Sequence, residues 1–297
     1  MRILKKSIPE AIAILILLIY MIPFALILIN ASKSTVDILR DPIAMPESFT
    51  LIFKNIAEVY ASPNVQYPSA FMSSVIITVI SCALIVMISS MAAWVLVRTK
   101  TKLSSAIFMM FVAAMVIPFQ VVMFPLVSWL FQIESFLGLR AIGRSIGVGD
   151  SLRILYNYPG IILAYMGFGT SLSIFLYHGF IKSVPLELEE AAMIDGASKS
   201  GTFFKIVFPI LKPITMTVII LNGIWIWNDF LLPMLVLGSF GGVQTLPLAV
   251  SSFVGSFSKK WDLILAAALM VMAPAIVVFL FLQKYIMKGM VDGSVKG

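Results

Sequence analysis

Long apolar segments alternate with short polar ones along the whole chain. Each apolar segment has about 20 residues or more, the length that a helix needs to cross a bilayer core of about 30 Å. The six segments are Ile8–Asn30, Ala70–Val97, Leu103–Phe131, Tyr158–Ile181, Ile214–Leu237 and Leu263–Leu282. The strands of a membrane barrel would be shorter and would alternate apolar with polar residues. The pattern therefore predicts an all-α polytopic membrane protein with six transmembrane helices.

Composition supports this fold class. The 297 residues are 60% apolar and only 12% charged, and the mean hydropathy is +1.04. So few charges could not cover the surface of a soluble domain. We expect residues 1–297 to form a single transmembrane domain. The first apolar segment is too long for a cleavable signal peptide and has no convincing cleavage site, so we interpret it as a retained helix.

Basic residues indicate the orientation of the chain. If the N-terminus is cytoplasmic, the inside stretches are 1–7, 98–102, 182–213 and 283–297. These hold thirteen of the 21 lysines and arginines, although the outside loops are longer. The bias predicts that both termini are cytoplasmic. It also accounts for most of the net charge of +7, and no basic soluble module is present that would bind nucleic acid.

Two of the outside loops and the prolines allow further expectations. The amphipathic stretch Phe49–Tyr60 predicts a short surface helix, and the loop 132–157, with several glycines, is expected to be irregular. Prolines lie in several apolar segments, at Pro23, Pro118, Pro125, Pro233 and Pro274. Each can kink its helix. Prolines are also commoner in membrane helices than in soluble ones, so both interpretations stay open.

The most polar part of the chain is the loop 184–213. Pro185 suits the first position of a short helix, and the carboxylates of residues 187, 189 and 190 would follow in its first turns, where the helix dipole favours negative charge. Gly196 can end that helix in a left-handed conformation. A second helix restarts around Ser198–Thr202 and runs towards Pro209, with its aromatic residues at the membrane surface. Such a charged helix–turn–helix suits contact with a soluble partner.

Residue chemistry argues against an enzyme. The chain has one cysteine, Cys82, and one histidine, His178, so no metal-ligand cluster or catalytic set can be assembled. We expect His178 to be packed or interfacial. The phosphate-binding pattern G-x-x-x-x-G-K-[ST] is missing from the sequence. No catalytic residue, metal or cofactor is therefore predicted on this chain.

The loop 184–213 resembles the signature of the permeases of ABC importers, E-A-A, three residues, G, nine residues, I-x-L-P. Every spacing is kept, and Phe208 stands where the pattern has leucine. The fuller form E-A-A-x-x-D-G-A is also met. The resemblance implies that this loop couples the spans to a cytoplasmic ATPase. The residues it assigns to coupling are Glu187, Glu190, Ala191, Ala192, Asp195, Gly196, Ala197, Ile206 and Pro209.

Further motifs resemble those of the carbohydrate permeases of maltose-type importers. They are W-N-D-F at 227–230 and the tail Q-K-Y…K-G…G-S-V-K-G from 283 to 297. Over essentially its whole length, the chain resembles the shorter of the two permeases in such importers. Two departures lie outside: Ser73-Ser74 replaces the usual Asn-Ser, and the loop 138–157 is longer than usual. The resemblance implies a type I ABC importer permease fold in a bacterial or archaeal cell membrane.

The same resemblance implies the cargo and partners. The cargo is a carbohydrate. The partners are a second homologous permease, a dimer of cytoplasmic ATPases that bind ATP and Mg, an extracellular or periplasmic solute-binding protein, and membrane lipid. Another cargo, such as a phosphorylated polyol or a peptide, remains an alternative. An ion-driven secondary transporter is a weaker one, since only Asp229 is an acidic residue well inside a predicted span.

A polar and aromatic group in the fifth segment is the candidate cargo path. It consists of Asn222, Trp225, Trp227, Asn228 and Asp229. Amide and carboxylate groups can hydrogen-bond sugar hydroxyls, and indole rings can stack on the apolar face of a sugar. The alternative is that Asn228 and Asp229 tie down broken helix backbone before Pro233.

Overall fold

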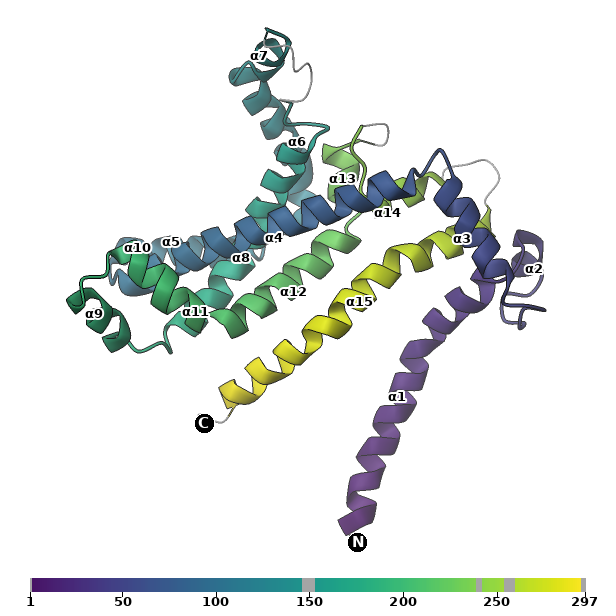
Figure 1. The fold of residues 1–297 in the computed structure, drawn as a ribbon, viewed down its shortest axis with the longest axis horizontal. Helices are drawn as coiled ribbons and strands as arrows, with labels where there is room; N and C mark the ends of the chain where they lie inside the picture. Colours follow the sequence, from purple (N-terminus) through teal and green to yellow (C-terminus); the bar gives the residue numbers. More distant parts are fainter. Residues whose placement is uncertain (1, 146–152, 239–241, 254–259, 295–297) are drawn as a thin grey trace. The chain divides into compact units, whose positions relative to one another are not determined.

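The computed structural model describes residues 2–145, 153–238, 242–253 and 260–294. Within these ranges the regular structure is entirely helical. The helices drawn in Figure 1 belong to two compact units. The first unit comprises residues 1–69 and 249–274, and the second comprises residues 70–248 and 275–297. The end of the tail motif, 295–297, lies outside the described residues.

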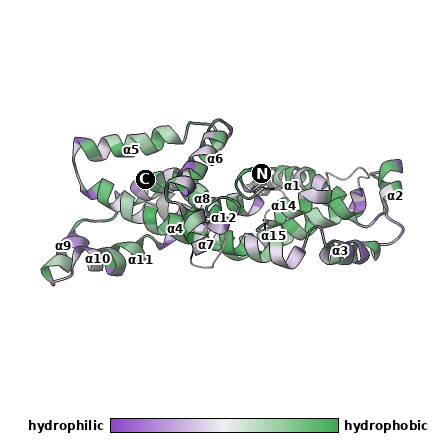
Figure 2. Cartoon of the chain, turned by 90° about the horizontal axis from the view of Figure 1, so that it is seen from above, coloured by the Kyte–Doolittle hydropathy of each residue, from purple (hydrophilic) through white to green (hydrophobic). Residues whose placement is uncertain are grey.

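Five of the described helices are long and apolar enough to cross a membrane. They are α1 (Arg2–Ala31), α4 (Tyr67–Arg98), α6 (Phe119–Phe136), α8 (Tyr158–Ile181) and α15 (Trp261–Ser294). A sixth span results if the bent pair Lys199–Ile210 and Lys212–Asn228 is counted as one, with 75° between its two parts. Figure 2 shows apolar residues along the long helices and polar ones gathered at helix ends and connections. The prediction of a polytopic helical membrane protein is confirmed.

The third apolar segment, predicted as one helix over Leu103–Phe131, is two helices. One is α5 (Lys102–Ala114) and the other is α6. Between them Pro118 adopts an extended conformation with φ −59° and ψ 132°. Because proline has no N–H group and disfavours helical geometry in the residue before it, the first helix cannot continue through this position. Only α6 is long enough to count as a span.

The fifth segment, predicted over Ile214–Leu237, is also broken. Helix α12 (Lys212–Asn228) ends at Asp229, which is extended with ψ 133°, and α13 (Leu231–Val236) follows. The Oδ1 atom of Asp229 accepts a hydrogen bond from the N–H of Leu231 at 3.0 Å. Pro233 lies inside the first turn of α13, where no intrahelical N–H donor is needed. The break is therefore set by Asp229, four residues before the proline.

The connections contain more helix than expected. The predicted surface helix is present as α3 (Leu51–Ala61), preceded by α2 (Thr35–Arg40). The expectation of an irregular loop over 132–157 is wrong for its first part. Here α6 continues to Phe136 and α7 (Leu139–Ser145) follows. Residues 146–152 lie outside the described ranges. Two short helices, α14 (Leu246–Val250) and η3 (Ser251–Phe253), precede α15.

In the first unit, polar side chains join the end of α1 to the helices after it. The Nδ2 atom of Asn55 on α3 donates to the carbonyl of Ala31 at 3.0 Å. The ammonium group of the buried Lys33 donates to Asn30 Oδ1 at 3.2 Å and to the Asp41 carbonyl at 3.0 Å. The bonds to Ala31 and Asp41 satisfy backbone carbonyl groups at the ends of α1 and α2, where intrahelical partners are missing.

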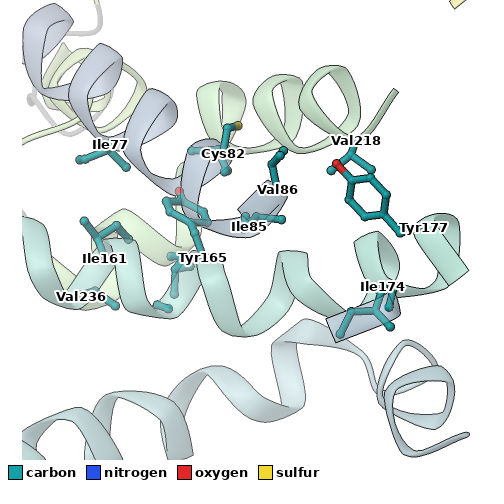
Figure 3. Close-up of a cluster of buried hydrophobic side chains, with 14 of the residues drawn as sticks. Ile77, Cys82, Ile85, Val86, Ile161, Tyr165, Ile174, Tyr177, Val218 and Val236 are labelled. Carbon is teal, nitrogen blue, oxygen red and sulfur yellow. The ribbon is translucent and has the colours of Figure 1, made fainter. Parts of the chain in front are cut away.

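The core of the second unit lies between α4, α8, α12 and α13 (Figure 3). Ile77 and Ile85 on α4 and Ile161 on α8 are fully buried there. The helices approach closely at Gly169 of α8, where an added Cβ would lie 2.5 Å from both Asn222 Oδ1 and Ile85 Cδ1. Small residues allow such close approach between membrane helices. This core positions α4, and the end of α4 contacts the polar segment 184–213, which we call the elbow.

Candidate functional site

The helix that carries the E-A-A motif is α9 (Glu187–Ile194), at one end of the second unit (Figure 1). It ends in two backbone hydrogen bonds, from Gly196 N–H to the Met193 carbonyl at 3.1 Å and from Ala197 N–H to the Ala192 carbonyl at 2.9 Å. Gly196 has φ +87°. These features define a Schellman motif, in which glycine avoids the strain that a side chain would meet. The predicted glycine stop is confirmed.

The beginning of α9 differs from the prediction. Pro185 does not occupy the first helical position, because the helix begins two residues later, at Glu187. The carbonyl of Leu186 accepts hydrogen bonds from the N–H groups of Glu189 at 2.9 Å and Glu190 at 3.1 Å. Leu186 thus provides the first acceptor of the helix, and the proline precedes the cap.

The second helix of the elbow restarts where predicted but is not a uniform α-helix. The hydroxyl oxygen of Ser198 accepts from Gly201 N–H at 3.1 Å and caps α10 (Lys199–Thr202). A π-helical turn, η2 (Phe203–Val207), and the short α11 (Phe208–Ile210) follow. Sequence reasoning missed this turn. Single π-turns inside helices frequently lie at functional sites.

One face of α9 is open. Glu187, Glu190, Ala191 and Ile194 are all exposed, and their spacing of three and four residues places them on one side of a helix. Ile194 is 86% exposed, and Asp195 beside it is also exposed. The face combines carboxylates with small and apolar side chains, which suits a basic groove with an apolar floor on a partner.

The remaining coupling residues lie at the turn and along the second helix. Ala192 and Ala197 are half-buried, as is Ile206 in η2, whereas Pro209 in α11 is exposed. Ala192 and Ala197 are joined by the backbone bond of the Schellman motif. The structure therefore brings Glu190, Ala191 and Asp195 together with the turn, and places Ile206 and Pro209 on the adjoining helix.

The opposite face of α9 holds Glu189, which sequence reasoning did not select. Glu189 is only 3% exposed. Its Oε1 atom accepts from Arg98 Nε at 2.9 Å and from Arg98 Nη2 at 2.7 Å, and its Oε2 atom accepts from Trp94 Nε1 at 2.9 Å. Arg98 Nη2 also donates to the Val184 carbonyl at 3.0 Å. Both donors belong to the last turns of α4, so the carboxylate is buried but fully matched by donors.

Phe203 was expected at the membrane surface but is buried, at 1% exposure. Its ring packs on Trp94, with 5.2 Å between ring centroids, and on Phe204 and Phe208 at 5.1 and 5.9 Å. Only Phe204 among these neighbours is clearly exposed, at 44%. The elbow is therefore anchored on α4 through Trp94 rather than on lipid through Phe203.

Two of the candidate cargo-path residues take part in helix packing. Asn222 is buried, and its Nδ2 atom donates to Ser173 Oγ at 3.0 Å and to the Val218 carbonyl at 2.9 Å. Trp227 is 9% exposed and meets the Phe71 ring edge-on at 5.8 Å. Their side chains join α12 to neighbouring helices.

The other three cargo-path residues are more open. Trp225 is 36% exposed and contacts the Tyr165 ring edge-on at 5.3 Å. Asp229 is half-buried and accepts a hydrogen bond from the Tyr165 hydroxyl at 3.0 Å. Asn228 is exposed and donates to the Ile224 carbonyl at 2.8 Å. Asn228 and Asp229 thus bind backbone groups at the break, while part of this group also remains accessible.

A buried acidic residue also lies near the end of α6. Because α6 extends beyond Phe131, Glu134 falls in its last turns and is only 1% exposed. Its Oε2 atom accepts from the N–H groups of Ile154 at 3.0 Å and Leu155 at 2.9 Å, and its Oε1 atom lies 3.6 Å from Arg153 Nε. Glu134 lies near the end of α6, and Asp229 lies at the end of α12, so Asp229 is not well inside a helix as predicted.

His178 and Cys82 have packing roles. The His178 imidazole stacks on the Phe108 ring with 3.6 Å between centroids, as expected for a packed histidine. Cys82 is buried in α4 (Figure 3). In the described ranges, no group of three His, Cys, Asp or Glu side chains is placed to hold a metal ion.

Known proteins provide an independent comparison. Residues 85–292 match the family model described as binding-protein-dependent transport system inner membrane component. The chain is 35% identical, over 98% of its length and 97% of the relative's, to the probable starch degradation products transport system permease protein AmyC of Thermoanaerobacterium thermosulfurigenes. It is 36% identical, over 94% of its length and 92% of the relative's, to the melibiose/raffinose/stachyose import permease protein MelC of Bacillus subtilis.

A solved structure supports the fold. The chain of a bacterial ABC transporter involved in the import of the acidic polysaccharide alginate matches with a TM-score of 0.70 and 18% identity, over 94% of this chain and 95% of that one. At this identity the likeness shows the fold alone. Family match, relatives and fold agree. The chain therefore belongs to the binding-protein-dependent transport system inner membrane components, the membrane-spanning permease subunits of ABC importers.

Proposed function

We propose that this chain is the permease subunit of an ATP-driven importer that takes up a carbohydrate delivered by an extracellular binding protein. The observation that carries the proposal is the construction of α9, whose open face presents Glu190 and Ala191 while its other face is fixed to α4 through Glu189. Relatives named for starch degradation products and for melibiose, raffinose and stachyose support a carbohydrate as cargo.

In the proposed mechanism, α9 is the coupling helix and lies on the cytoplasmic side, with both termini. Two ATPase chains bind ATP and Mg, and neither is bound by this chain. Closure of the ATPase dimer moves α9, and the spans then alternate between inward-facing and outward-facing states. Glu190 pairs with basic groups of the ATPase, while Ala191 lets its surface approach the helix closely.

The transmembrane pathway is proposed to form against a second, homologous permease. Among the predicted cargo-path residues, the exposed ones near the break between α12 and α13 are Trp225 and Asn228. An indole face can stack on a sugar ring and an amide can bond its hydroxyls. Asn222 and Trp227 are proposed to hold α12 in place and not to contact the cargo, because their own contacts are with neighbouring helices.

The proposal is tested by isolating the tagged chain from its own membranes in mild detergent and measuring uptake of radiolabelled maltotriose and raffinose by cells. We expect an ATPase and a second permease to co-purify. Glu190→Lys and Gly196→Pro should abolish uptake and leave the chain in the membrane, whereas Lys100→Gln, at an exposed cation outside the elbow, should not. Normal uptake in either elbow variant would contradict the coupling role.

The same cells distinguish the alternatives. Collapse of the proton gradient at constant ATP should leave uptake unchanged; loss of uptake would favour an ion-driven transporter. Uptake of a phosphorylated polyol or a peptide, with neither sugar transported, would keep the importer and replace the cargo.

A further inference from the structure

The contact between α9 and α4 is a set of directed bonds from two side chains one helical turn apart. Arg98 and Trp94 together give the Glu189 carboxylate three hydrogen bonds, all between 2.7 and 2.9 Å. A guanidinium group donates through a rigid planar fork, so the two bonds from Arg98 fix direction as well as distance. The third bond runs from the Trp94 indole to the other carboxylate oxygen, Oε2. It prevents the carboxylate from rotating about its two bonds to Arg98.

The turn and the cap of the elbow are made by other bonds. Its turn is closed by the backbone bonds of Gly196 and Ala197, and its second helix is capped by Ser198, all within the elbow itself. The bonds to α4 are therefore additional. They connect the elbow to the span and therefore bear on its orientation.

Trp94 connects α4 to both parts of the elbow. Its Nε1–H group bonds to Glu189 on α9, and its ring packs on Phe203 at the start of the π-helical turn. Arg98 adds a bond to the Val184 carbonyl, which precedes α9. The end of α4 thus contacts the segment that precedes α9, α9 itself and the start of the π-helical turn η2.

We propose that Arg98, Trp94 and Glu189 form a rigid link that makes α9 and the end of α4 move as one body, and that Glu189 is the positioning residue of this link. The consequence for transport rests on the proposed function. When the ATPase displaces α9 through its open face, α4 is displaced with it, because α9 does not rotate relative to α4. Glu190, one residue away, points to the partner, and Glu189 points to the span.

The test is a distance measurement between two spin labels, at Val95→Cys on α4 and Leu188→Cys on α9, both of which are exposed and lie outside the open face of α9. The protein is the full complex in lipid nanodiscs, without nucleotide and after trapping with ATP, Mg and vanadate. A sample without added cysteines reports any labelling of the buried Cys82. Three substitutions are added to the labelled pair, namely Glu189→Gln, Arg98→Lys and the control Lys100→Gln.

In the labelled pair and in Lys100→Gln, we expect one narrow distance distribution that trapping does not shift. Glu189→Gln keeps the size of the side chain but places an amide N–H₂ group next to the donors of Arg98 and Trp94. The distance distribution should therefore broaden, and it should shift on trapping. The ATPase should still co-purify and hydrolyse ATP. Arg98→Lys keeps the charge and loses the fork, and should give an intermediate width.

Two results would overturn the proposal. One is a shift on trapping in the labelled pair itself, which would mean that α9 rotates on α4 during the cycle. The other is an unchanged distribution in Glu189→Gln with only a lower yield of complex, which is what a purely stabilising role predicts. Failure of an ATPase to co-purify with the unsubstituted chain would instead contradict the proposed function, and the nucleotide-free comparison would still decide the link.

Discussion

The Tyr165 hydroxyl group donates a hydrogen bond to Asp229 Oδ2, with 3.0 Å between the two oxygens, at the point where α12 ends. The tyrosine is fully buried on α8, and its ring also meets Trp225 edge-on, with 5.3 Å between centroids. One buried side chain thus supports both a half-buried carboxylate and an accessible indole of the candidate cargo path. This arrangement distinguishes Tyr165 from a tyrosine that only packs.

Removal of that hydroxyl group should affect transport more than stability. Tyr165→Phe deletes one hydrogen bond, which is expected to cost about 1 kcal/mol of stability, and it leaves Asp229 Oδ2 without the Tyr165 donor. Tyr177→Phe is the matched control, because Tyr177 is equally buried on α8 and donates to Thr215 Oγ1 at 3.0 Å, away from the break. We expect similar losses in the apparent melting temperature of the purified complex, but slower initial cargo uptake only for Tyr165→Phe. Equal uptake rates would contradict the role of Tyr165.

The crossing of α8 and α12 predicts a strong difference between two glycines of one helix. Gly169→Ala places a Cβ 2.5 Å from Asn222 Oδ1 and Ile85 Cδ1. Asn222 cannot withdraw freely, because its Nδ2 atom is held by Ser173 and the α12 backbone. We expect a loss of about 1–3 kcal/mol, measured as a lower melting temperature by fluorescence-detected size exclusion. Gly167→Ala, with no atom within 4 Å of its added Cβ, should change little. A comparable loss at both positions would show that the crossing is not tightly packed.

The sequence predicts the spans, whereas it leaves a break before Pro233 as one of two interpretations. Tyr158–Ile181 has the same bounds in the pattern and in α8, because hydropathy over about 20 residues identifies a membrane helix. Hydropathy does not register local backbone conformation. Pro118 interrupts one segment through its own geometry, whereas the break at Asp229 is stabilised by the side chain of Tyr165, 64 residues away. No pattern in the fifth segment contains that contact.

The elbow was predicted best where a residue type determines backbone geometry. Gly196 marks the left-handed stop in the sequence as it does in the structure. Glu189 and Glu190 are the same residue type side by side, and only the position of Arg98 and Trp94 determines which one is buried. A long-range contact of this kind requires the packed structure of α4 against α9.

Gly196 allows a graded test of the turn. A residue with a Cβ costs roughly 1–2 kcal/mol in the left-handed conformation, and asparagine tolerates it better than alanine. We therefore expect the yield of co-purified ATPase to fall in the order Gly196, Gly196→Asn, Gly196→Ala. Gly179→Ala serves as the control, because that glycine has open space around it and no positive φ. An alanine variant that retained the full yield would show that the turn can be remodelled when the partner binds.

The two carboxylates Glu134 and Glu58 should respond differently to neutralisation, because one is buried and the other is exposed. Glu134, at 1% exposure, accepts from Ile154 N–H and Leu155 N–H and faces Arg153. Glu134→Gln weakens this buried set, and we expect a loss of about 1–3 kcal/mol of stability. Glu58 pairs with Lys260 at 3.1 Å, but their side chains are 48% and 58% exposed, so Glu58→Gln should cost less than about 1 kcal/mol.

The melting temperatures of the two variants are measured at low and high salt. High salt should reduce the small loss of stability in Glu58→Gln and leave the large loss in Glu134→Gln unchanged, because buried pairs are screened much less than exposed ones. Losses that are equal and sensitive to salt would mean that water reaches Glu134.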